Sequence, residues 1–121
     1  MTPILFTATT RPDKARQFFT EVMGFTLTHD SPFSLEFDAA GTMLRVQKVQ
    51  ELNPHPFTAI GWKVGDIVAE RDRLSARGAK FLKFEFMEQD ELDIWTTPDG
   101  AKVCWFKDPD GNTLSLTEWG G

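Results

Sequence analysis

The amino-acid sequence predicts an α+β fold built from two modules with the same order of elements, a strand, a helix and then three strands. Short runs with apolar residues at alternate positions, typical of strands, are interrupted by two patterns with helical spacing. A segment with two prolines in three residues, Glu51–Pro56, separates two halves of the same plan. Residues 41–48 also resemble residues 111–118, with glycine and aliphatic residues at matching positions. These observations together indicate an internal duplication.

The first module is expected to span residues 1–50. Pro3–Thr9 has the alternation of a strand, and Thr10 is the predicted N-cap of a helix that has Pro12 in its first turn. Gly24 would end this helix. The helix carries an apolar stripe that must pack on a sheet: Ala15, Phe18, Phe19, Val22 and Met23. Three short strands are predicted to follow, at Phe25–His29, Ser34–Asp38 and Met43–Lys48.

Glu51–Pro56 is the predicted linker, and the second module is expected to span residues 57–121, so that both modules form a single domain. The predicted elements of this module are a strand at Phe57–Val64, a helix from its Asp66 cap to about Arg77, a strand at Lys80–Phe86, and a short edge strand at Ile94–Thr97. An acidic segment up to Asp93 is predicted to be a solvated loop.

The C-terminal run Lys102–Trp119 is predicted to form a tight hairpin. Asp108–Asn112 supplies the turn, because Pro109 fixes its own φ and Gly111 or Asn112 can adopt a positive φ. Period-two alternation places Leu114, Leu116 and Glu118 on one face of the last strand. The carboxylate of Glu118 is therefore expected to point either into a pocket or towards the frayed end of the strand.

Length and composition exclude several classes of protein. The chain has 121 residues, of which 40% are hydrophobic and 26% charged, as expected for one globular domain. Its net charge of −5, with no basic tract, argues against nucleic acid or an anionic membrane as a partner. Cys104 is the single cysteine, so no intrachain disulfide can form, and it is predicted to be buried. The N-terminal residues have no signal-peptide pattern, which favours the cytoplasm.

The hairpin sequence also carries a family resemblance. Phe106–Asn112 followed by Leu-x-Leu-x-Glu resembles the closing hairpin of the vicinal oxygen chelate superfamily, which includes glyoxalase I, bleomycin-resistance proteins and extradiol dioxygenases. The two-module plan resembles this superfamily over nearly the whole chain. The resemblance implies a curved eight-stranded mixed sheet with its helices on the convex side and a ligand cup on the concave side.

The resemblance also implies where a metal would lie, and the residues there differ. Metalloenzymes of the superfamily take a His or Gln from the first strand of each module and a Glu from the last strand of each. Here the first strands offer Ile4–Phe6 and Thr58–Ile60, and the counterpart of Glu118 is Lys48, or Gln47 in a register shifted by one. We therefore predict no metal and no other cofactor. Glu118 could be a half-exposed terminal carboxylate, a ligand contact, or the partner of Lys48 in an ion pair.

The function predicted on this basis is binding of an apolar or aromatic small molecule in the cup, without a metal, by a homodimer. Aromatic residues on cup-lining strands can stack on a ligand. The candidate ligand-binding residues are Gln47, Lys48, Trp95, Trp105 and Glu118. The alternative is an enzyme of the same superfamily, of the lyase, isomerase or dioxygenase type. Its catalytic residue would be Glu118, acting with a divalent metal or as a general acid or base.

Overall fold

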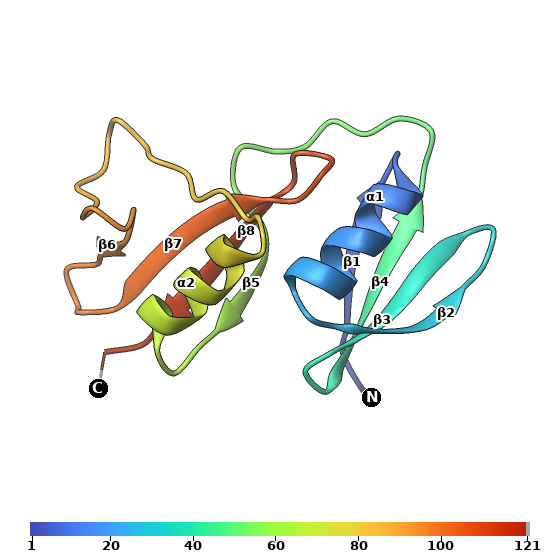
Figure 1. Cartoon of the computed structure of the whole chain (residues 1–121), viewed down its shortest axis with the longest axis horizontal. Coiled ribbons are helices and arrows are strands. Elements are labelled where there is room, and N and C mark those ends of the chain that lie inside the picture. Colours follow the sequence, from blue (N-terminus) through green and yellow to red (C-terminus); the bar gives the residue numbers. More distant parts are fainter. Residues whose placement is uncertain (121) are drawn as a thin grey trace. The chain divides into compact units, whose positions relative to one another are not determined.

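A computed structural model describes residues 1–120 of the chain, which divides into two compact units. The first unit comprises Met1–Pro54 together with Asp108–Gly111, the turn of the C-terminal hairpin. The second comprises His55–Lys107 and the residues from Asn112 onward. In each unit, helical structure lies against one face of a four-stranded sheet (Figure 1).

The first unit has strand order β1-β4-β3-β2, in which β1 and β4 are parallel and the other neighbours are antiparallel. The helix α1 continues directly into a π-helical turn, η1. The bounds of these elements are β1 Ile4–Thr9, α1 Pro12–Gln17, η1 Phe18–Val22, β2 Thr26–Asp30, β3 Ser34–Ala39 and β4 Thr42–Lys48.

The apolar stripe of the first helical segment packs on the sheet as predicted. Phe19 is fully buried, and its ring centroid lies 5.5 Å from that of Phe37 on β3. Leu44 and Val46 of β4 face the same core and are fully buried. Burial of side chains of this size contributes about 1.5 to 3 kcal/mol each, so this layer is the main source of stability in the unit.

The predicted role of Thr10 as the cap of α1 is wrong. The residue before the helix is Arg11, and no side chain caps the helix N-terminus. The hydroxyl of Thr10 instead donates to a carboxylate oxygen of Asp110, with an oxygen–oxygen distance of 2.9 Å. The backbone N–H of Thr10 donates to the same carboxylate at 2.8 Å, so Asp110 fixes this residue ahead of the helix, which begins at Pro12.

The second unit has strand order β5-β8-β7-β6, with β5 and β8 parallel and β7 antiparallel to both of its neighbours. Its elements are β5 Thr58–Lys63, α2 Ile67–Ala76, β6 Trp95–Thr96, β7 Lys102–Lys107 and β8 Thr113–Glu118. The prediction of two βαβββ-like modules is confirmed. The eight strands form two hydrogen-bonded sheets of four strands each.

The strand predicted at Lys80–Phe86 is wrong. Only one bridge forms there, between Phe81 and Phe106 of β7. Farther along, the backbone N–H of Phe84 donates to the side-chain carbonyl of Gln89 at 2.6 Å. Because a side chain of the same loop accepts this hydrogen bond, the strand pairing does not continue.

The cap of α2 is as predicted, since the side chain of Asp66 accepts a hydrogen bond from the backbone N–H of Ala69 at 3.1 Å. Ile67 and Leu74 of this helix face the core. Cys104 is fully buried in β7, and burial raises the pKa of its thiol to about 12, so the thiolate is scarce at neutral pH. Among residues 1–120, no helix has the length and apolar character needed to span a membrane.

Candidate functional site

The face of the second sheet opposite α2 carries the aromatic residues predicted to bind a ligand. Along β7, Cys104 and Phe106 are buried in the core that packs against α2. Alternation places Trp105 between them on the opposite face, next to Ser115 of β8. Trp95 of β6 pairs with Val103 and therefore projects from the same face as Trp105.

Trp95 and Trp105 lie together as a stacked pair. Their ring centroids are 6.2 Å apart and the ring planes differ by 29°. The indole N–H of Trp105 donates to the hydroxyl of Thr58 at 3.0 Å. Both indole side chains remain partly exposed. The hydrogen bond fixes the orientation of one indole, and the stacking fixes the other, so that two flat rings are held in place beside solvent.

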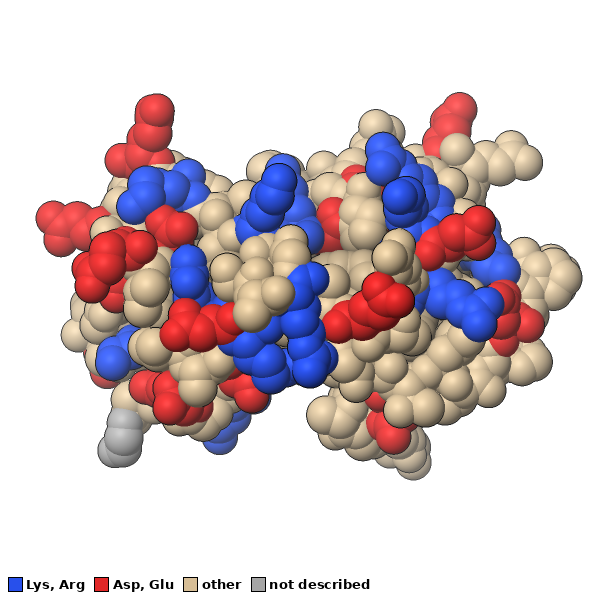
Figure 2. Space-filling model, in the orientation of Figure 1, with Lys and Arg blue, Asp and Glu red and all other residues tan. Residues whose placement is uncertain are grey.

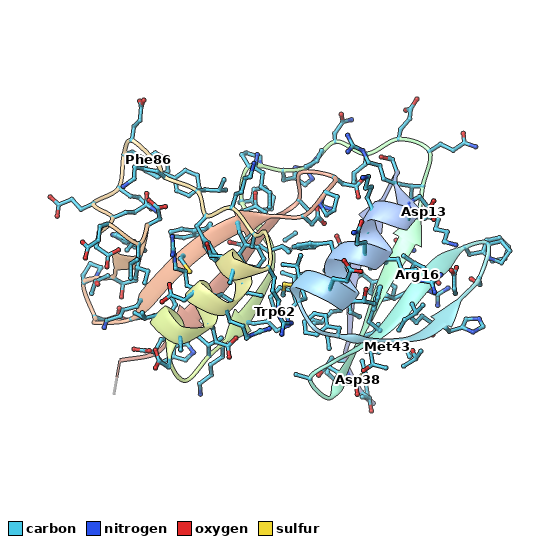
Figure 3. The ribbon with its side chains drawn as sticks, viewed as in Figure 1. Asp13, Arg16, Asp38, Met43, Trp62 and Phe86 are labelled. Carbon is cyan, nitrogen blue, oxygen red and sulfur yellow. The ribbon has the colours of Figure 1, made fainter. Side chains whose placement is uncertain are left out.

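Two phenylalanines of the loop between α2 and β6 extend this group. The ring of Phe84 meets Trp105 edge to face at a centroid distance of 5.5 Å, and Phe86 lies 5.5 Å from Phe84. Figure 3 shows Phe86 projecting from the loop, and it is 80% exposed. We refer to these four residues (Phe84, Phe86, Trp95 and Trp105) as the aromatic surface.

The loop that carries the two phenylalanines is held on β7 by specific hydrogen bonds. The backbone N–H of Leu82 donates to the carbonyl of Trp105 at 2.8 Å. The amide of Gln89 donates to the carbonyls of Leu82 and Asp93, at 2.9 and 2.8 Å. Gln89 thus joins both ends of the loop segment and keeps Phe84 beside Trp105. These hydrogen bonds fix the loop on the sheet, so the aromatic surface is ordered before any ligand binds.

The acidic residues of this loop are largely solvated, as predicted. Asp90 accepts hydrogen bonds from the backbone N–H groups of Leu92 and Ile94, and Asp93 pairs with Lys83 at 3.1 Å. The remaining acidic residues of the loop are exposed: Glu85, Glu88 and Glu91. Figure 2 shows acidic side chains projecting around this part of the second unit.

Glu118 projects from β8 on the α2 side of the sheet, in phase with the buried Leu114 and Leu116. Its carboxylate accepts a hydrogen bond from the backbone N–H of Ile67, the first residue of α2, at 3.0 Å. A carboxylate at a helix N-terminus is favoured by the free N–H groups and by the helix dipole. This carboxylate therefore joins the last strand to the helix, on the face opposite the aromatic surface.

Gln47 and Lys48 lie on opposite faces of the first sheet. Lys48 is in phase with the buried Val46, and its ammonium donates to Asp30 at 2.6 Å and to the carbonyl of Ser31 at 2.7 Å. Gln47 is exposed on the other face. The structure therefore gives both Lys48 and Glu118 a partner within their own units.

The ion pair of Lys48 with Asp30 should contribute to the stability of the fold in a pH-dependent way. The hydrogen bond from Lys48 holds the pKa of Asp30 below its ordinary value. The pair therefore stabilises the fold above about pH 4, and this contribution disappears as the pH falls through the lowered pKa. In Lys48→Met, we expect the pKa of Asp30 to rise, as measured by NMR titration of its carboxyl carbon. An unchanged titration would contradict the pairing.

A divalent metal does not fit the residues at the family's usual ligand positions. The first strands offer aliphatic, aromatic and threonine side chains there, the Lys48 ammonium is bound to Asp30, and the Glu118 carboxylate is bound to the α2 N-terminus. An ammonium offers no lone pair to a cation. Within the described residues, no three His, Cys, Asp or Glu side chains gather as a metal site would require.

Of the five predicted ligand-binding residues, the structure brings together Trp95 and Trp105. The supporting contacts of Thr58 and Gln89 were not predicted, because they depend on which segments meet in space. The alternation of the sequence also indicates that polar residues of β4 share the face of the first sheet opposite its core. Alternation along β4 places Arg45 in phase with the exposed Gln47 and opposite Leu44 and Val46.

These features define a two-module α+β protein with an aromatic surface on one sheet. The family profile described as Glyoxalase/Bleomycin resistance protein/Dioxygenase superfamily matches residues 5–116. The chain belongs to this superfamily, and the predicted resemblance is confirmed. A comparison with curated proteins gives no match.

Solved structures share the fold over nearly the whole chain. TioX from Micromonospora sp. ML1 is 20% identical, with a TM-score of 0.76 and 98% of each chain covered. TnmS3, an antibiotic binding protein from Streptomyces sp. CB03234, is 23% identical, with a TM-score of 0.74 and coverage of 99% of this chain and 96% of that one. A superfamily member from Sphaerobacter thermophilus DSM 20745 is 23% identical, with a TM-score of 0.76 and coverage of 98% and 97%.

Proposed function

We propose that this protein binds a planar, apolar or aromatic small molecule on the aromatic surface, without using a metal. The observation that carries this proposal is the stacked and hydrogen-bonded pair of Trp95 and Trp105, whose rings stay partly exposed. Oriented aromatic rings with a polar anchor are the usual elements of a small-molecule site.

Two further observations support the proposal. The aromatic rings are carried by a strand and by a loop that Gln89 fixes at both ends, so little ordering is required when a ligand binds. TnmS3, which shares this fold, is described as an antibiotic binding protein. The likeness to TnmS3 concerns the fold, and it supports a binding function for this fold without naming the ligand.

The test is titration of the protein with coumarin, a neutral planar aromatic probe, followed by tryptophan fluorescence and isothermal calorimetry. We expect saturable quenching with the wild-type chain. In Trp105→Leu we expect at least about a tenfold loss of affinity, because a central aromatic contact typically contributes more than 1 kcal/mol. Thr58→Val keeps the indole ring of Trp105 but removes the hydroxyl that accepts its N–H hydrogen bond. We expect a smaller loss of affinity for coumarin in this variant.

Trp119→Leu is the matched control. Trp119 follows β8, is 59% exposed and belongs to no ring pair of the aromatic surface. Its removal should leave the affinity for coumarin unchanged. Equal affinities for wild type and Trp105→Leu, with both folded by circular dichroism, would contradict the proposed site.

The alternative of an enzyme that uses Glu118 stays a prediction. The hydrogen bond from Ile67 gives this carboxylate a structural role, and Glu118 lies on the opposite face of the sheet from the aromatic surface. Catalysis by Glu118 requires that Glu118→Gln abolish turnover while the unfolding temperature stays near that of the wild type. If Glu118→Gln lowered the unfolding temperature without abolishing turnover, the role of Glu118 would be to stabilise the N-terminus of α2.

We also propose a homodimer. Each sheet has two outer strands whose free backbone groups can pair with another chain, β1 and β2 in the first and β5 and β6 in the second. Association of two identical chains would cover such edges, and twofold homodimers are the commonest oligomers. Sedimentation velocity should give twice the chain mass of 13.7 kDa, and a monomer at micromolar concentration would contradict this proposal.

A further inference from the structure

Arg45 is a cation that lacks a partner in the described part of the chain. It lies in the middle of β4 on the face opposite α1, and its Nε atom is buried and has no hydrogen-bond acceptor. Glu36 of β3 lies beside Arg45 in the strand register, yet within the described residues 1–120 these two side chains form no ion pair. A buried, unsatisfied donor of a charged group is costly, so such a donor usually indicates a missing acceptor.

Ser34 presents a second unsatisfied polar atom on the same face. Its side chain is 0% exposed, and its Oγ has no hydrogen-bond partner among the described residues. Ser34 pairs with Gln47 in the register of β3 and β4, whereas Arg45 pairs with Glu36 two residues farther along. Ser34 and Arg45 are therefore diagonal neighbours on one face, a separation of about 7 to 8 Å that one bound group can bridge.

The chemistry of these donors selects the missing group. The edge of a guanidinium formed by Nε and one terminal nitrogen donates two parallel hydrogen bonds to a carboxylate. The hydroxyl of Ser34 can donate a third to the same anion. A neutral carbonyl would satisfy one donor and leave the cation without a counter-charge, while the neighbouring carboxylate of Glu36 disfavours a multiply charged ligand.

The same face offers an apolar area beside the donors. Phe6 of β1 is the register partner of Arg45 and is 52% exposed, and Ile4 and Met43, also paired in register, are 44% and 40% exposed. Met43 lies on the first sheet in Figure 3. A ligand with an apolar body and one acidic group would therefore contact the apolar side chains and the unsatisfied donors together.

We infer that the first unit holds a second binding site, in which Arg45 and Ser34 bind the carboxylate of an apolar monocarboxylic acid. The apolar body lies on Ile4, Phe6 and Met43, and the exposed amide of Gln47 borders the carboxylate. This site is built from residues other than those of the aromatic surface, and the inference does not depend on the function proposed for that surface.

The test compares 2-naphthoate with 2-naphthamide, which has the same body without the charge, by isothermal calorimetry. The wild-type chain should bind the acid at least about tenfold more tightly than the amide. Arg45→Gln should remove this preference, and Ser34→Ala should reduce it. The two probes share the naphthalene ring, so the ratio of their affinities measures the contribution of the carboxylate alone. Binding of the ring to the aromatic surface contributes equally to both probes and does not change this ratio.

Arg16→Gln is the matched control, since it removes the same charge from an exposed position on α1 of the same unit. This variant should keep the full preference for the acid. Equal binding of acid and amide by the wild type, or an unchanged preference in Arg45→Gln, would overturn the inference.

A measurement without any ligand provides a second readout. Replacing Arg45 by Met retains most of the side-chain volume and removes the unsatisfied donor. The ligand-free Arg45→Met variant should therefore unfold a few degrees above the wild type, although it no longer prefers 2-naphthoate. An unfolding temperature below that of the wild type would show that Arg45 has a stabilising partner in the free protein, and would contradict the inference.

Discussion

Phe19→Ala is expected to destabilise the chain by about 3 to 5 kcal/mol, the range found when a fully buried phenylalanine is truncated. Phe19 is 0% exposed and lies at the centre of the first core. Its ring contacts Phe18 at 5.1 Å, Phe37 at 5.5 Å and Phe25 at 6.5 Å between centroids. The loss includes both the burial of the ring and the cavity left among these neighbours. Urea denaturation followed by circular dichroism measures it.

Phe33→Ala is the control for this experiment. It is the same substitution in the same unit, at a side chain that is 75% exposed. The expected change is within about 0.5 kcal/mol, as for most surface substitutions. If the two variants lost the same stability, the packing of η1 on the sheet described above would be incorrect.

Asp110→Ala is expected to cost about 2 kcal/mol, because hydrogen bonds to a charged acceptor are lost and the buried hydroxyl of Thr9 is left without an acceptor. The carboxylate accepts from the hydroxyl of Thr9, from the backbone N–H of Thr10 at 2.8 Å and from the hydroxyl of Thr10 at 2.9 Å. Thr9 is 1% exposed. These contacts join the turn of the last hairpin to the end of β1, about a hundred residues earlier.

The amide of Thr10 supplies a local readout, since its hydrogen exchange should accelerate in Asp110→Ala. Asp110→Asn keeps an acceptor oxygen and should lose less stability than the alanine variant. Asp72→Ala is the control, because this aspartate lies on the exposed surface of α2 and pairs only with its neighbour Arg71 among the described residues. Equal stability of Asp110→Ala and Asp72→Ala would contradict the role of the turn.

Periodicity alone predicted which side chains of a strand share one face, and the structure shows which of those faces are buried. Leu44 and Val46 in β4, and Leu114 and Leu116 in β8, alternate with residues of the opposite face, and all four are buried. Alternation is a local property of the extended backbone, so it can be read without knowing which strands pair. The hairpin turn was predictable for a similar reason, since Gly111 adopts a φ of +89°, a conformation that glycine reaches without steric strain.

The aromatic part of the candidate site could be predicted only as a set of residues. Trp95 and Trp105 stood out by their position on strands, but their stacking depends on the pairing of β6 with β7. The strand predicted at Lys80–Phe86 failed because Gln89, five residues beyond Phe84, supplies the acceptor that a neighbouring strand would have supplied. A side chain competing for a backbone N–H leaves no periodic signal.

The sequence by itself determined the duplication and the faces that strand and helix residues share, because these follow from local periodicity and turn chemistry, and the motif of the last hairpin indicated the family. The partners of the polar groups were decided only in the tertiary structure. Glu118 meets the N-terminus of α2, Lys48 meets Asp30, and Thr10 meets Asp110. The donor or acceptor that a polar side chain finds depends on which segments the fold brings within about 3 Å, and sequence spacing does not encode that distance.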